Sequence, residues 1–122
     1  MIEILLLLTL LSIKHFIADF VIQFDYMIQE KGRYGKMGGI HHSFIHGFGT
    51  FLVFGWFLNP IAFWAGIADF IIHYHIDWAK IKITMNKGYT PADKQFWFWL
   101  GLDQLLHALT YIVLVGWALL LI

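Results

Sequence analysis

Histidine and aspartate recur four residues apart in each long hydrophobic stretch of this sequence. Residues four apart lie on one face of an α-helix, one turn from each other. Two imidazoles, or an imidazole and a carboxylate, on one face can hold the same metal ion, as the two histidines of an H-E-x-x-H helix do. The sets are His15 and Asp19; His42 and His46; Asp69, His73 and Asp77; and Asp103 and His107.

We expect these side chains to form one metal site for one or two divalent ions. Imidazole nitrogen and carboxylate oxygen suit zinc first, with manganese or iron as alternatives. The expected ligands are His15, Asp19, His42, His46, His73, Asp77, Asp103 and His107. The expected catalytic side chains are Asp19, Asp77, Asp103 and Lys80. One aspartate would be the general base, and Lys80, on the face of Asp77, would either extend to the interface or neutralise a phosphate.

Other polar residues in these stretches have more than one interpretation. His41 and His75 lie off the faces of their sets and are expected at the interface or behind the ligands. Asp69 is a ligand, a partner that orients His73, or a partner of Lys14. Gln23 and Gln104 suit the polar lining of a pocket. The whole cluster can also be structural, because polar side chains join membrane helices through hydrogen bonds.

The elements that carry these residues are expected to be membrane-spanning helices. The chain has 122 residues, of which 60% are hydrophobic and 13% charged, with a mean hydropathy of +0.70. A typical soluble domain has about 25% charged residues. The composition therefore excludes an ordinary soluble domain and a disordered tail, and a net charge of zero gives no reason to expect a nucleic-acid partner. The absence of cysteine excludes thiolate ligands and disulfides.

Four stretches are long enough to cross a hydrocarbon core, which takes about 20 apolar residues. They are residues 2–24, 40–58, 60–83 and 95–122. The sequence thus predicts an all-α membrane protein, residues 1–122 forming a single domain with a four-transmembrane-helix antiparallel bundle. Asn59-Pro60 is the whole link between the second and third stretches, and Pro60 is suited to open the third helix. Glycines at 47, 49, 66 and 101 are expected to allow close helix approach.

The basic residues predict an orientation in a bacterial inner membrane. They gather in and beside the polar links 25–39 and 84–94, which the positive-inside rule places in the cytoplasm, with both termini opposite. The first stretch begins with Glu3 and lacks a small-residue cleavage site, which is unlike a signal peptide. All four sets then lie roughly 7–18 Å below the basic face. We expect a polar pocket open to the cytoplasm, with the other half of the bundle closed by Leu, Ile, Phe and Trp.

The ordered motifs resemble a family of small integral membrane proteins of bacteria and their phages. The motifs are His15-Phe16-Ile17-Ala18-Asp19-Phe20-x-x-Gln23, His42-x3-His46, His73-x3-Asp77-x2-Lys80 and Asp103-Gln104-x2-His107. That family is a domain of unknown function, so the resemblance implies a shared polar site and no established activity. A looser similarity, in motif style alone, is to membrane-bound metal-dependent hydrolases.

Several functions are compatible with this pattern. The first is a metal-dependent hydrolase that acts from the cytoplasmic side on a lipid or lipid-linked (phospho)ester. The alternatives are a non-enzymatic phage or host membrane factor with a structural His/Asp cluster, a metal-ion or proton transporter, and a haem protein. Membrane lipids are the expected surroundings, and the small size favours a homo-oligomer.

Overall fold

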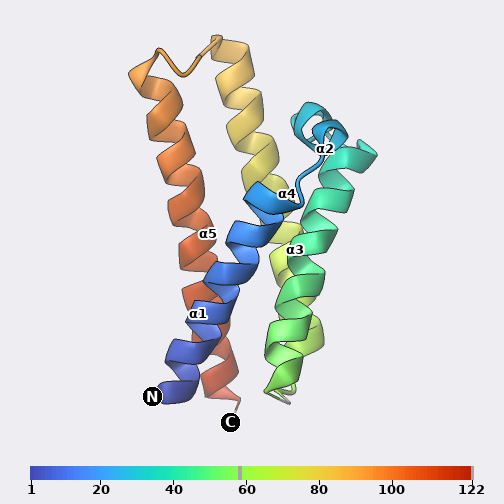
Figure 1. The fold of residues 1–122 in the computed structure, drawn as a ribbon, viewed down its shortest axis with the longest axis vertical. Coiled ribbons are helices and arrows are strands. Elements are labelled where there is room, and N and C mark those ends of the chain that lie inside the picture. The colour runs from blue at the N-terminus through green and yellow to red at the C-terminus, as the bar shows by residue number, and fades with distance from the viewer. Residues whose placement is uncertain (58, 122) are drawn as a thin grey trace.

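The computed structural model describes residues 1–57 and 59–121, and these residues form helices and connecting turns with no strand. Figure 1 shows long helices that alternate in direction. The elements are α1 (Ile2–Phe16), the π-helix η1 (Ile17–Val21), α2 (Asp25–Glu30), α3 (Met37–Trp56), α4 (Ala62–Lys87) and α5 (Lys94–Leu120). The all-α class and the antiparallel order therefore agree with the sequence.

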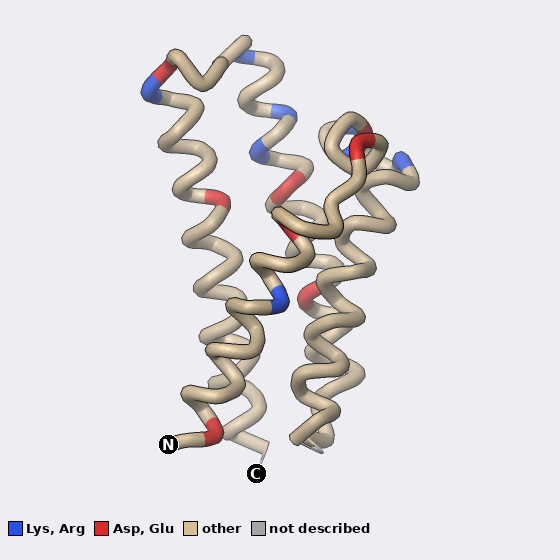
Figure 2. Tube along the Cα trace, viewed as in Figure 1, with Lys and Arg blue, Asp and Glu red and all other residues tan. Residues whose placement is uncertain are grey.

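Two helical segments are long and apolar enough to cross a membrane. They are the continuous run of α1 and η1, Ile2–Val21, and α5, Lys94–Leu120. The start of α1 and the end of α5 lie together at one end of the bundle, while α2 and the link between α4 and α5 lie at the other (Figure 1). Most Lys and Arg gather toward that second end, and an acidic residue lies near the N-terminus (Figure 2).

The helix bounds differ from the sequence-based bounds at several ends: α3 begins at Met37 and not at residue 40, α4 continues past residue 83 to Lys87, and α5 begins at Lys94 and not at residue 95. The first helix ends at Val21, and the expected polar link 25–39 contains the short helix α2. Pro60 does not open the third helix, which begins at Ala62. The Asn59 side chain accepts the N–H of Ile61 at 3.1 Å, and its carbonyl accepts the N–H of Ala62 at 3.1 Å, so a turn occupies Pro60. Residues 58 and 122, where two helices were expected to end, lie outside the described residues.

The helices α3 and α4 pack closely because two glycines face each other. A Cβ atom added to Gly47 would lie 2.6 Å from the Gly66 carbonyl oxygen, and one added to Gly66 would lie 2.8 Å from that of Gly47. Gly49 likewise leaves room for the stem of Lys14, 2.6 Å from its would-be Cβ. These expectations are confirmed. The expectation for Gly101 is wrong, because nothing lies within 4 Å of its would-be Cβ.

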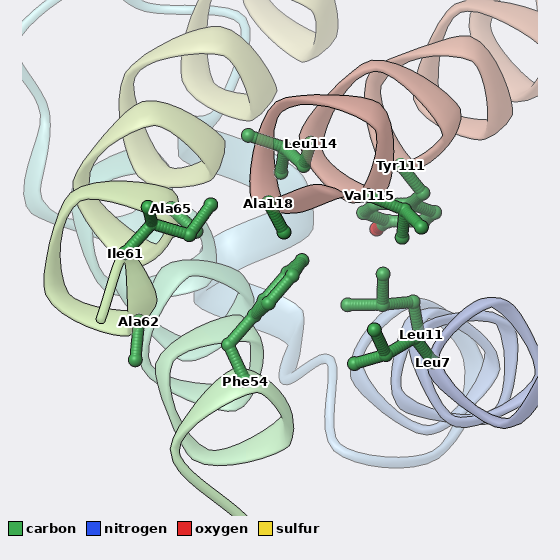
Figure 3. Packing of buried hydrophobic residues seen from close by; sticks show 10 residues of the cluster. All are labelled: Leu7, Leu11, Phe54, Ile61, Ala62, Ala65, Tyr111, Leu114, Val115 and Ala118. Carbon is green, nitrogen blue, oxygen red and sulfur yellow. The ribbon is translucent and has the colours of Figure 1, made fainter. Parts of the chain in front are cut away.

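An apolar core fills the end of the bundle near the termini. Figure 3 shows its side chains meeting from all four long helices. The members are Leu7, Leu11, Phe54, Ile61, Ala62, Ala65, Tyr111, Leu114, Val115 and Ala118. Tryptophan, which was expected here, is absent from this cluster: none of the six is buried, and Trp56 is 82% exposed. The apolar core closes the bundle on the terminal side and places the polar side chains toward the other end.

Candidate metal centre

Five histidines from the four long helices converge on one place in the bundle. Their ring centroids are 3.5 Å apart for His46 and His73, 4.1 Å for His73 and His107, and 4.8 Å for His42 and His46. His15 lies 5.0 Å from His107. Four of these rings are buried, and only His15 is half-buried. Packing of the four helices thus brings together histidines that are far apart in the sequence and that lie on the predicted polar faces.

The π-helix η1 positions Asp19 at the centre of this cluster. It is closed by a bond from the Ile22 N–H to the Ile17 carbonyl, 2.9 Å long. Such π-bulges recur at functional sites because the extra residue changes where a side chain points. The Asp19 Oδ2 atom lies 3.0 Å from His15 Nε2, while Oδ1 faces the histidines of α3.

Asp19, His42, His46 and His73 form a four-ligand group, whose ligand atoms all lie within 4.8 Å of one another. Asp19 Oδ1 is 3.1 Å from His42 Nε2, 3.0 Å from His46 Nε2 and 3.8 Å from His73 Nε2. Zinc binds such atoms at about 2.0–2.2 Å in a tetrahedron, which places the ligand atoms about 3.3 Å from each other. The observed separations fall around that value, so the four side chains fit a small divalent ion with little movement.

A second group shares one histidine with the first. His73, Asp77 and His107 also have ligand atoms within 4.8 Å of one another. Asp77 Oδ1 lies 3.2 Å from His107 Nε2, and Asp77 Oδ2 lies 3.2 Å from His42 Nε2. This group offers three ligands, and the ammonium of Lys31 lies 3.3 Å from Asp77 Oδ2. A fixed cation at that distance disfavours a metal ion on the same carboxylate oxygen.

Lysine partners distinguish the four buried aspartates of the bundle. Three of the four form an ion pair with a lysine: Lys14 with Asp69 at 2.8 Å, Lys31 with Asp77 at 3.3 Å, and Lys80 with Asp103 at 3.3 Å. In the described part of the chain, histidines are the only basic side chains within 4.0 Å of the Asp19 carboxylate. A buried carboxylate requires a compensating positive charge. For Asp19 that charge must come from protonated imidazoles or from a bound cation.

Three of the expected site residues lie outside both groups. His15 reaches Asp19 but pairs through Nδ1 with the hydroxyl of Tyr111 at 2.8 Å. Asp103 contacts His107 at 3.5 Å, pairs with Lys80 at 3.3 Å and accepts a hydrogen bond from Gln104 at 3.0 Å. The structure therefore places Lys80 as the counter-ion of Asp103, beside the histidine cluster and not within it.

Asp69 is the partner of Lys14, one of the three interpretations of this residue. Lys14 Nζ donates to Asp69 at 2.8 Å and to the Tyr111 hydroxyl at 2.9 Å, and it lies 3.5 Å from His46 Nδ1. The Thr50 hydroxyl also donates to Asp69. This network separates the histidines from the apolar core.

The two remaining histidines lie off the site, as expected. Both are exposed, and each pairs with a tyrosine near the α2 end of the bundle. His41 pairs with Tyr26 and His75 with Tyr34, each at 3.0 Å. They are therefore natural controls for the five clustered histidines.

Sequence reasoning missed two residues of the site. Lys31 was counted as a basic residue of a polar link, yet it is buried and also donates to Gln23 at 2.8 Å. Helix periodicity does not predict the position of Lys31 beside Asp77, because Lys31 lies in the turn that follows α2. Tyr111 was overlooked although it follows His107 by four residues, so that the α5 motif continues for another turn on the same face.

The expected pocket open to the polar links is not what the structure shows. There Lys31, at the end of α2, covers Asp77, and the ligand side chains are buried. A pocket that touches the site opens instead between α1 and α5, where His15, Gln104 and Tyr111 form part of its lining. The polar lining role expected for Gln104 is confirmed, while Gln23 bonds with Lys31.

Comparison with known families covers almost the whole chain. The model of a family described as proteins of unknown function, DUF3307, matches residues 6–121. The chain belongs to this family. The matched range contains every histidine and aspartate of the site described above. No curated protein and no solved structure matches the chain.

Proposed function

We propose that this protein is a membrane-embedded metal protein that binds one divalent ion, zinc first, at Asp19, His42, His46 and His73. The observation that carries the proposal is the environment of Asp19. It is a buried carboxylate without a lysine partner in the described structure, and three imidazole Nε2 atoms lie 3.0–3.8 Å from one of its oxygens. Imidazole nitrogen and carboxylate oxygen are donors that zinc binds, and zinc with four such donors can expand to a fifth ligand during a reaction.

An inverted distribution of polarity supports a four-span bundle in a membrane. Four aspartates and four histidines are buried inside it, whereas large apolar side chains cover its outside, such as Trp56, Val113 and Phe20, which are 82%, 67% and 65% exposed. A soluble protein rarely exposes apolar surface so widely, and ionisable groups of membrane helices face the bundle interior. The positive charge at the α2 end supports its placement in the cytoplasm.

The shared histidine favours one ion over two. His73 Nε2 faces both carboxylates, at 3.8 Å from Asp19 and 3.5 Å from Asp77. A neutral imidazole offers a single lone pair at that nitrogen, so His73 serves one ion at a time. Lys31 beside Asp77 disfavours the three-ligand group, which leaves the four-ligand group as the preferred site.

Hydrolysis of a lipid or lipid-linked ester is the reaction that we propose for this site. A bound divalent ion would supply Lewis acidity and an activated water. Asp77, held between Lys31 and His107, is the carboxylate placed to accept a proton beside the four-ligand group. A transport pathway has less support, because the apolar core lies between the histidines and the terminal end.

Metal analysis of the purified full chain tests the proposal. We expect about one equivalent of zinc per chain by elemental mass spectrometry, and its loss in His46→Ala. His41→Ala is the matched control, because His41 is on the same helix but bonds with Tyr26 away from the cluster. Metal-free protein after purification and after zinc addition would refute the proposed function.

A further inference from the structure

A groove on the surface between α1 and α5 reaches His15 and Gln104, which contact Asp19 of the four-ligand group. It has a volume of about 360 Å³. Leu8, Ser12 and His15 line it on α1, and Gln104, Ala108 and Tyr111 line it on α5. On each helix these positions are three or four residues apart and form a single stripe.

Two small residues make the groove hollow. Ser12 and Ala108 occupy the middle of the two stripes, and both are exposed. The Ser12 hydroxyl donates to the carbonyl of Leu8 at 2.8 Å, so it is satisfied within its own helix. The middle of the groove therefore has no unsatisfied polar group from Ser12, and it suits a hydrocarbon chain.

The polarity of the groove changes along its length. Because α1 and α5 run in opposite directions, His15 and Gln104 both lie toward the α2 end, and Leu8 and Ile112 toward the termini (Figure 1). An acyl lipid of the leaflet at the α2 end has the same polarity, with its linkage nearer that surface and its chain toward the bilayer centre. Among the described residues that line the groove there is no lysine or arginine, which matches an uncharged linkage.

The polar end of the groove adjoins the carboxylate of the four-ligand group. His15 Nε2 lies 3.0 Å from Asp19 Oδ2, and Gln104 Nε2 lies 3.5 Å from the same oxygen. His15 is six residues before Val21, about 9 Å inside the end of that helix at 1.5 Å per residue. An ester can enter to this depth while a charged headgroup stays near the surface.

We infer that this groove binds an ester-linked acyl lipid of the leaflet at the α2 end, with its ester at His15 and Gln104 and its chain past Ser12 and Ala108. The role of that lipid as substrate rests on the proposed metal-dependent hydrolysis. The binding itself rests on the shape and polarity of the groove.

Photocrosslinking tests the inference. The full chain is reconstituted in phosphatidylethanolamine–phosphatidylglycerol vesicles that contain a phosphatidylethanolamine with a diazirine in mid-chain, irradiated, and mapped by peptide mass spectrometry. We expect adducts several-fold more frequent at Ser12 and Ala108 than at Leu109 and Val113, which are exposed on α5 outside the groove. Ala108→Phe fills the groove and should remove the excess, whereas Leu109→Phe should not.

Zinc content of the same samples separates the two proposals. Equal labelling inside and outside the groove, in protein that carries zinc, overturns the lipid site and leaves the metal centre standing. Groove labelling in protein that carries no zinc overturns the proposed function and the substrate role, while the lipid site stands. Groove labelling that persists in a folded Ala108→Phe protein also overturns the site.

Discussion

His42 Nε2 and His73 Nε2 lie 3.2 Å apart on facing helices, and the Nδ1 atom of each ring is buried without a hydrogen-bond partner in the described structure. A hydrogen bond between the two Nε2 atoms needs one of them to carry no proton. That ring then holds its proton on Nδ1, where nothing accepts it, at a cost of about 1–3 kcal/mol. A metal ion held by both Nε2 atoms would also leave the proton of each ring on Nδ1, so the unpaired Nδ1 atoms do not favour the metal-free pair or the metal-bound pair.

The shared position of His73 predicts a stoichiometry. We expect the wild-type chain to bind one zinc ion, His73→Ala to bind none tightly, and His107→Ala to keep the ion, because His107 belongs only to the three-ligand group. Cobalt titration followed by visible absorption, which reports tetrahedral coordination, measures this. Two ions per chain in the wild type, with one lost in His107→Ala, would show that both groups are filled together.

The ion pair of Lys14 and Asp69 predicts a large coupling in stability. Lys14→Met alone should lower the free energy of unfolding by about 3–5 kcal/mol, because it leaves a buried carboxylate uncompensated. The double variant Lys14→Met/Asp69→Asn should recover a substantial part of that loss and retain zinc. A double-mutant cycle of unfolding in detergent measures the coupling, and additive losses would contradict it.

Lys31 predicts control over access from the polar side. Its buried ammonium covers Asp77 and is held by Gln23. We expect Lys31→Ala to release zinc faster to a chelator, because the side chain that separates Asp77 from the α2 end is removed. Lys36→Ala is the control, since Lys36 is an exposed residue of the same link. Equal release rates for the two variants would show that ions leave by another route.

The contact of Gly47 with Gly66 predicts that α3 and α4 tolerate no side chain at this crossing. Gly47→Val should destabilise the protein by about 1–3 kcal/mol, as overpacking does. Gly101→Ala, which meets open space, should be neutral or stabilising by about 0.5–1 kcal/mol, since alanine favours a helix over glycine. Thermal unfolding in one detergent compares the two, and equal effects would argue against a close crossing.

Much of the site could be predicted because helix periodicity is local. The spacing of four fixed which side chains share a face, so the meeting of His46, His73 and His107 needed only that the faces turn inward. The antiparallel order followed from short links, and the partnership of Lys14 with Asp69 was among the foreseen alternatives.

The tertiary structure decided which of these residues belong together. The rotation of each helix about its axis, and the π-helix at Asp19, decided that His15 and Asp103 lie outside the four-ligand group. Residue spacing along a helix does not predict this rotation. The fold of the link after α2 brought Lys31 into the bundle, because a buried aspartate there needs a counter-charge. The sequence by itself determined the helices and their polar faces, and only three-dimensional packing decided which aspartate was left to the histidines.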